Sequence, residues 1–301
     1  MQRLYKYLKM ALVVLLALTL VLWALGYSAL KGLKEDQPQM FADPIFDTLA
    51  PVLPLSISQA SDGSVRRPSI LVFSKTNGYR HREGIAAARK MFEAMAAKRN
   101  WLLFYTENAA VFSEQSLAKF DVVVMSNATG PLMNSQQQSA FKSFLENGGG
   151  FVGVHAAGDS SHADWSWYQD QLIRAKFVGH PMLPQFQTAT VKIEDLSHPA
   201  MAHLAKIWQH KEEWYCFESS PRANVNVLAS IDESDLNMLS VNSSTGAVTN
   251  MAMGDDHPVI WHHNIGRGRV FYSALGHAAE TYQREEIKTM LESAVIWAGR
   301  F

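Results

Sequence analysis

The sequence is poor in cysteine, since Cys216 is the only one among 301 residues. A single thiol excludes an intrachain disulfide and any zinc site built from several cysteines. An excess of charge of one sign is also lacking, because 27 lysines and arginines face 28 aspartates and glutamates. The resulting net charge of −1 gives no electrostatic reason to expect nucleic acid as a partner. The HExxH signature of helical zinc proteases is absent as well.

The chain does contain enough apolar material for a large core. Hydrophobic residues make up 48% of it and charged residues 18%, which excludes an intrinsically disordered protein. A chain of this length forms one large α/β domain or two smaller ones.

A long apolar stretch without charge lies near the N-terminus, at residues 11–30. As a helix it would rise roughly 30 Å, enough to cross a bilayer. It follows a basic flank that contains Arg3, Lys6 and Lys9. We therefore predict that residues 1–30 are a membrane anchor or uncleaved signal, with the body on the periplasmic or extracellular side. A cleaved signal peptide is the alternative, because Ala24 and Gly26 form a small-x-small site.

Residues 31–68 carry five prolines and no persistent helical or strand period. This composition is typical of a linker, here one that packs in part on the body. The body is assigned to residues 69–301.

Within the body, short apolar runs alternate with helical patterns. Strands are predicted at 69–75, 101–108, 120–130, 151–159, 188–195, 213–219, 225–232, 258–264 and 268–277. Helices are predicted at 84–100, 134–150, 165–173 and 283–297, the second with a Ser135–Gln138 capping box. The alternation indicates an α/β fold with a mainly parallel sheet and helices on both faces. Ligands of such sheets lie beyond the carboxyl ends of the strands.

Two histidines stand at predicted strand ends. The stretch "GGGFVGVHAAGD" turns sharply at His155, where several hydrolase folds place a Ser or Cys nucleophile. His277 ends the last strand in the same way, and Asp159 is an acid close to His155. Histidine suits proton transfer near neutral pH and also binds zinc or iron. We predict that His155, His277 and Asp159 are catalytic, or that the two histidines hold a divalent metal, with their rings on the order of 10 Å apart or less.

Further polar side chains follow other strands or lie in irregular segments. Candidate substrate-binding residues are Arg80, His81, Asn127 and His180, and Glu212 and Glu213 are candidate acids. Structural alternatives stay open for three of the histidines and acids: His81 as a helix cap, Asp159 as a turn former, His180 as a residue that stabilises a turn before proline. His162, His203 and His210 are predicted to lie on the surface.

Six segments of the chain, in order, resemble proteins of the ThuA-like (trehalose utilisation) family. They are "ILVFSKTNGYRH", "GGGFVGVHAAGD", "FVGHP", "HPAM", "EEWYCF" and "PVIWHHNIGRGRVFYSALGH". The resemblance covers residues 69–301 and implies a class I glutamine amidotransferase-like fold, a flavodoxin-like α/β sandwich. It places His155 at the position of the amidotransferase cysteine and His277 at that of a later histidine. Glutaminase activity is therefore not expected, because that chemistry needs a thiolate at this turn.

The resemblance also implies the acidic role of Glu213, although the family often has Asp-Glu where this chain has Glu212 and Glu213. It implies a small-molecule sugar as substrate, including an oxidised (keto) disaccharide. We therefore expect an exported, membrane-tethered enzyme acting on a carbohydrate, with hydrolase, lyase and isomerase activities all open. The alternatives are a non-catalytic sugar-binding module and a structural protein of the cell envelope.

Overall fold

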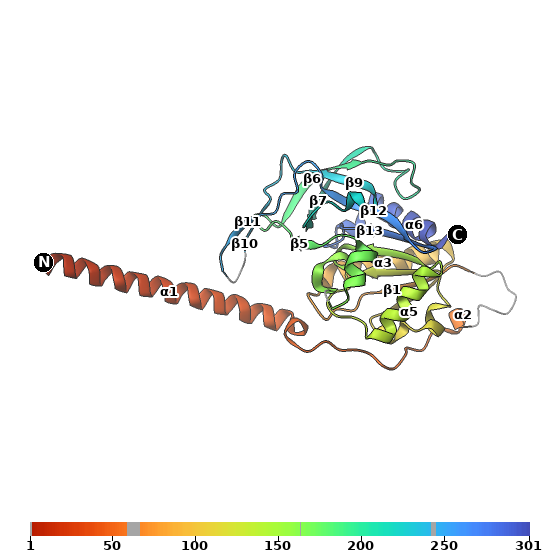
Figure 1. Ribbon diagram of the computed structural model, residues 1–301, viewed down its shortest axis with the longest axis horizontal. Helices are drawn as coiled ribbons and strands as arrows, with labels where there is room; N and C mark the ends of the chain where they lie inside the picture. The colour runs from red at the N-terminus through yellow and green to blue at the C-terminus, as the bar shows by residue number, and fades with distance from the viewer. Residues whose placement is uncertain (1, 59–66, 163, 242–244) are drawn as a thin grey trace.

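Nine strands form the central sheet, in the order β2-β1-β3-β4-β13-β12-β9-β6-β7. The computed structural model describes residues 2–58, 67–162, 164–241 and 245–301 (Figure 1). The sheet strands are β1 Ser69–Phe73, β2 Leu102–Thr106, β3 Val122–Ser126, β4 Gly150–Val154, β6 Phe186–Ile193, β7 Ile207–Glu213, β9 Asn226–Asp232, β12 Pro258–Ile265 and β13 Gly268–Ser273. Two small sheets pair β5 Phe177–Gly179 with β8 Cys216–Phe217 and β10 Leu239–Val241 with β11 Val248–Asn250. The longer helices are α1 Gln2–Asp36, α3 Arg82–Arg99, α5 Ser135–Glu146 and α6 Glu285–Gly299, and the short ones are α2 Leu55–Ser58 and α4 Glu114–Leu117.

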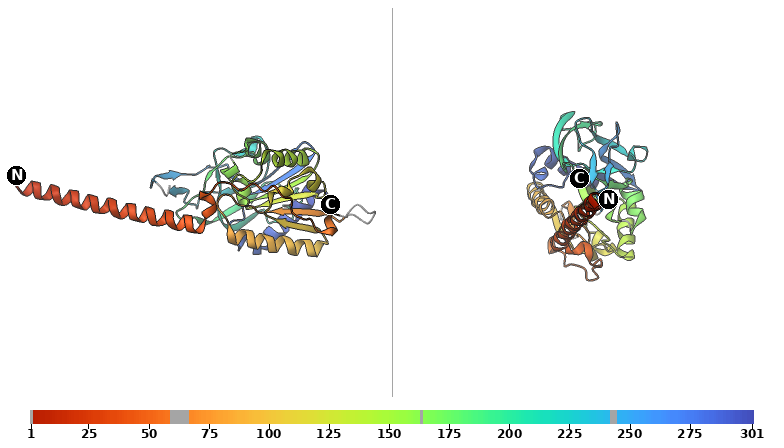
Figure 2. Two further views of the ribbon diagram at one scale, coloured as in Figure 1. Left: turned by 90° about the horizontal axis from the view of Figure 1, so that it is seen from below. Right: turned by 90° about the vertical axis from the view of Figure 1, so that its left-hand side faces the viewer.

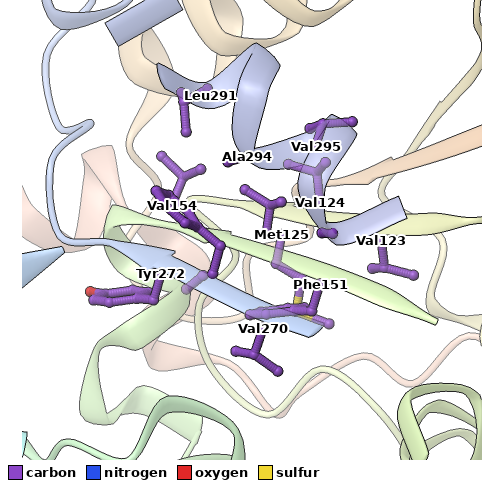
Figure 3. Close-up of a cluster of buried hydrophobic side chains, with 14 of the residues drawn as sticks. Val123, Val124, Met125, Phe151, Val154, Val270, Tyr272, Leu291, Ala294 and Val295 are labelled. Carbon is purple, nitrogen blue, oxygen red and sulfur yellow. The ribbon is translucent and has the colours of Figure 1, made fainter. Parts of the chain in front are cut away.

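The first five strands of the sheet are parallel, as the apolar runs predicted. All residues of β1, β3 and β4 are buried, which requires cover on both faces. Helices α3 and α6 lie on one face, joined by an ion pair between Arg99 and Glu292, and α5 lies on the other (Figure 2). Leu291, Ala294 and Val295 of α6 pack over the valines of β3 and β4 (Figure 3). The prediction of an α/β fold with a large, mostly parallel sheet is confirmed.

The other four strands form an antiparallel extension, in which β12 and β6 run against the remaining strands. The carboxyl end of β7 therefore points the same way as those of β4 and β13. Although three strands separate β7 from β13, the Glu212 Oε2 atom accepts a hydrogen bond from the Gly276 amide at 2.9 Å. The extension thus curves back until its edge strand meets the rim of the parallel half.

Two local predictions were wrong. The capping box of α5 is formed by Asn134 and Gln137, one residue before the predicted pair, because Asn134 has the extended backbone that an N-cap requires. The strand predicted at 213–219 is mostly absent: β7 ends at Glu213, and within that segment only Cys216–Phe217 pair, in a small separate sheet. The helix predicted at 165–173 is present, and its part at Tyr168–Ile173 is π-helical.

The N-terminal segment is one helix, α1, which projects from the body (Figures 1 and 2). It contains the predicted helix at 11–30. The prediction that it spans a membrane is not supported, because no helix in the described part of the chain is both long enough and apolar enough for that. The segment after it packs on the body: Ile57 is buried, and Asp47 forms an ion pair with Lys75.

Candidate functional site

His155 begins a tight turn directly after β4. Its φ of 51° lies in the left-handed region, which costs a non-glycine residue roughly 1–2 kcal/mol. The surroundings hold this conformation, because the Tyr272 hydroxyl donates to the His155 carbonyl at 2.8 Å. The ring Nδ1 lies 2.7 Å from the carbonyl oxygen of Ala274, so Nδ1 carries the hydrogen and Nε2 presents its lone pair when the ring is neutral. The ring is fully buried.

His277 stands beside it, in the turn that follows β13. The two ring centroids lie 5.2 Å apart, and His155 Nε2 is 3.2 Å from His277 Nδ1. The turn requires Gly276, whose φ is 137° and where a Cβ would lie 2.8 Å from a methyl group of Val154. The predicted proximity of the two histidines is confirmed, whereas their chemical roles remain predictions.

Glu213, at the end of β7, reaches both rings. Its Oε2 lies 2.9 Å from His277 Nδ1 and 3.3 Å from His155 Nε2. Its Oε1 accepts from Gln185 Nε2 at 2.5 Å and lies 3.2 Å from His180 Nε2. Burial alone would raise the pKa of Glu213, but hydrogen bonds from His155 and His277 hold that pKa far below the usual range. Likewise, burial acts to lower the pKa of His155, and the bond to Glu213 and its charge raise it on balance.

His81, predicted to bind substrate, completes the group. Its ring centroid lies 5.0 Å from that of His155 and 4.6 Å from that of His277. It is 7% exposed, and its Nδ1 has no hydrogen-bond partner within the described residues. Burial lowers its pKa well below the usual value, and the neighbouring histidines lower it further. One ligand atom from each of His81, His155, Glu213 and His277 lies within 4.8 Å of all the others.

Glu212 binds different groups from those that Glu213 binds. The side chain is fully buried, and its Oε2 lies 3.5 Å from His210 Nε2. Its Oε2 accepts from the Gly276 amide and the Thr281 hydroxyl, both at 2.9 Å, and its Oε1 accepts from the His277 amide at 3.3 Å. Glu212 therefore stabilises the turn that carries His277, whereas Glu213 contacts the His277 ring.

The structure does not bring Asn127 or Asp159 into this cluster. Asn127 is fully buried and donates to the Tyr282 hydroxyl at 2.9 Å and to the Gly276 carbonyl at 3.2 Å, behind the His277 turn. Asp159 accepts from the Ser161 amide at 2.9 Å, the turn role that the sequence left open. Burial raises the pKa of Asp159.

Arg80 and His180 lie at the margin of the cluster. The guanidinium of Arg80 makes a two-pronged ion pair with Glu107, at 2.8 and 2.7 Å, and faces the cavity described next. His180 contacts Glu213, and its side chain is 23% exposed.

A cavity of about 650 Å³ opens beside the cluster. It is lined by Asp36, Gln37, Tyr79, Arg80, His81, Arg82, Glu83, Gln185, Phe186, Lys211, His277, Ala278 and Glu280. Another cavity, of about 560 Å³, has walls that include Asp121 and Gly149, at the amino ends of β3 and β4. It is remote from the histidines, so we assign the candidate site to the first.

Sequence reasoning missed several members of the site. Gln185 lies in an irregular segment without a local signal. Tyr215, whose ring centroid lies 4.2 Å from that of His155, lies where a strand was predicted but the chain is irregular. His162 and His210, predicted to be exposed, are 4% and 2% exposed. His210 is buried because alternate residues of β7 face inward.

Fold and site together define an α/β protein in which histidines and a carboxylate, with no thiol, occupy the strand-end rim. The family model for ThuA, described as trehalose utilisation, matches residues 69–298, and the chain belongs to this family. A putative ThuA-like protein from Bacteroides uniformis has a similar structure, with 23% identity, a TM-score of 0.65, and coverage of 79% of this chain and 94% of that chain. One from Parabacteroides merdae has 17% identity, a TM-score of 0.59, and coverage of 77% and 90%. The search of curated proteins found no match.

Proposed function

We propose that the protein is a metal-dependent enzyme acting on a carbohydrate. The observation that carries the proposal is the triangle of His155 Nε2, His277 Nδ1 and Glu213 Oε2, with edges of 3.2, 3.3 and 2.9 Å. Ligand atoms around a tetrahedral zinc ion, bonded at 2.0–2.1 Å, lie on the order of 3.3 Å apart. His81 supplies a fourth donor atom, and its Nδ1 is buried without a partner in the described chain.

The groups behind the triangle fit the same interpretation. The Ala274 carbonyl fixes the tautomer of His155, as outer partners of metal-bound histidines commonly do. Gln185 and His180 occupy the other oxygen of Glu213, which leaves Oε2 for the cluster. A bound divalent cation would polarise a sugar oxygen or a water molecule.

The chain's own residues supply the rest of the site. The exposed edge of His277 faces the cavity, where it can hold or release a proton next to a bound hydroxyl. Arg80, Lys211 and Glu280 line the walls and can bind the hydroxyl groups of a sugar, and Tyr79 and Phe186 offer apolar faces. The family's description, trehalose utilisation, supports a sugar as the ligand.

Glutamine hydrolysis is not proposed. Cys216 is fully buried in β8, and burial raises the pKa of its thiol to about 12. A neutral, enclosed thiol is a poor nucleophile.

The test begins with metal content. Purified wild-type protein loaded with zinc or cobalt and then dialysed should retain about one ion per chain, by the ligand count above. His155→Ala should retain none, whereas His203→Ala, at an exposed histidine, should match the wild type. Wild-type protein that retains no ion would refute the metal centre. A screen with native and oxidised disaccharides then separates an enzyme, which releases product, from a binding module, which is only stabilised.

The location of the protein remains a prediction from residues 1–30. Fractionation of cells that express the full chain should recover the uncut protein with membranes if the segment is an anchor. A soluble form that begins near Tyr27 would instead show cleavage.

A further inference from the structure

Gln37, the first residue after α1, is bound to the loop that carries His81. Its side chain is only 1% exposed. Its Oε1 accepts from the Arg80 amide at 2.8 Å, and its Nε2 donates to the Arg80 carbonyl at 3.4 Å. The carboxamide therefore pairs with both backbone groups of the residue that directly precedes His81.

The residues on either side of Gln37 bind the same loop. Gln39 Nε2 donates to the Gly78 carbonyl at 2.9 Å. The Arg82 guanidinium donates to the Asp36 carboxylate at 3.2 Å and also to its main-chain carbonyl. Residues 36–39 thus make hydrogen bonds to positions 78, 80 and 82 of this loop. His81 lies between positions 80 and 82.

The position of the His81 ring depends on contacts that residues outside its own loop make with that loop. Its Nδ1 makes no hydrogen bond within the described residues, and its side chain does not cap α3. The position of its backbone therefore decides how far its ring lies from His155 and His277.

We propose that Gln37 is a positioning residue for His81 and that Asp36 and Gln37 form part of one wall of the substrate cavity. Asp36 and Gln37 line that cavity together with His81 and His277. These residues lie outside the family match, which begins at residue 69. The inference rests on the proposed function, in which His81 is a ligand of the cation.

The experiment compares full-length wild type with Gln37→Met, which keeps the length of the side chain and removes both bonds to Arg80. Gln37→Glu keeps the acceptor for the Arg80 amide and serves as partial rescue. Gln115→Met, at an exposed residue of α4, is the matched control. The two readouts are the dissociation constant for cobalt, by chelator competition, and hydrogen exchange of the amides at 78–82.

We expect Gln37→Met to weaken cobalt binding about tenfold, as is usual when an outer partner of a metal ligand is lost. Exchange at residues 78–82 should become faster, Gln37→Glu should fall between the two, and Gln115→Met should match the wild type. Unchanged exchange in Gln37→Met would overturn the inference, as would faster exchange with unchanged cobalt affinity. If wild-type protein binds no cobalt, the proposed function fails. The exchange data then decide the positioning role by themselves.

Discussion

Among the described residues, two groups of histidines have their rings close together, and only one of them has the properties of a site. In the first, His155 and His277 share Glu213 and face a cavity. In the second, His198 and His262 have ring centroids 4.6 Å apart and pack against Trp297. Burial lowers the pKa of His198, to about 4, and of His262, and within the described residues no carboxylate is hydrogen-bonded to either ring. A buried carboxylate, rather than the gathering of imidazoles, is therefore what makes a histidine cluster able to hold a cation or a proton.

The largest effect is expected from Glu213→Gln, which converts the first group into a neutral one like the second. Cation binding should be lost, with affinity at least 100-fold weaker, because the buried carboxylate that lies against both rings is replaced by a neutral amide. The pKa of His155 should fall, since the hydrogen bond and the charge of Glu213, which oppose the effect of burial, are then lost. Titration calorimetry with zinc and NMR of the ring measure the two effects. Glu218→Gln, at an exposed carboxylate, is the control, and retained zinc affinity in Glu213→Gln would contradict the comparison.

The next effect concerns stability. In Glu212→Gln one of the two carboxylate oxygens becomes an amide NH₂ group. Each oxygen accepts from two donors, so two buried donors lose their acceptor whichever way the amide turns. At about 1–3 kcal/mol for each buried group, unfolding free energy should fall by about 3 kcal/mol. Urea denaturation measures it, and a loss below about 0.5 kcal/mol would show that the turn of His277 does not need Glu212.

The parallel half and the histidine pair could be predicted because their signals are local. Unbroken valines mark β3 as a strand covered on both faces, and the strand-end rule places His155 and His277 at one rim. Glu213 reaches them only because the antiparallel extension curves back. No periodic pattern of residues in the sequence indicates that curvature. Asn127 also follows a strand directly, as the strand-end rule requires. Its left-handed backbone, with a φ of 53°, directs the side chain toward Tyr282 instead of the cavity.

A pH titration of the metal-free protein sharpens the contrast between the two groups. The folded-state pKa of His155 is raised, so its contribution to stability is full below the unfolded value of about 6.5 and is lost as pH rises through the folded pKa. The pKa of His198 is lowered, so stability is lost as pH falls from about 6.5 towards 4. NMR at pH 5.5 should show His155 protonated and His198 neutral. The same protonation state in both rings would remove the distinction.

The smallest effect is expected at Cys216, which lies next to the site in sequence but outside it in space. Its Sγ is 3.7 Å from the Trp214 carbonyl and faces the core, and its pKa near 12 keeps it neutral. Cys216→Ser should therefore leave zinc affinity within about twofold of the wild type and lower unfolding free energy by about 1 kcal/mol, because a buried hydroxyl replaces a thiol. Calorimetry and urea denaturation of the same sample separate the two quantities. A large loss of zinc affinity with stability preserved would place the thiol in the site and would remove the main argument against thiol chemistry in this protein.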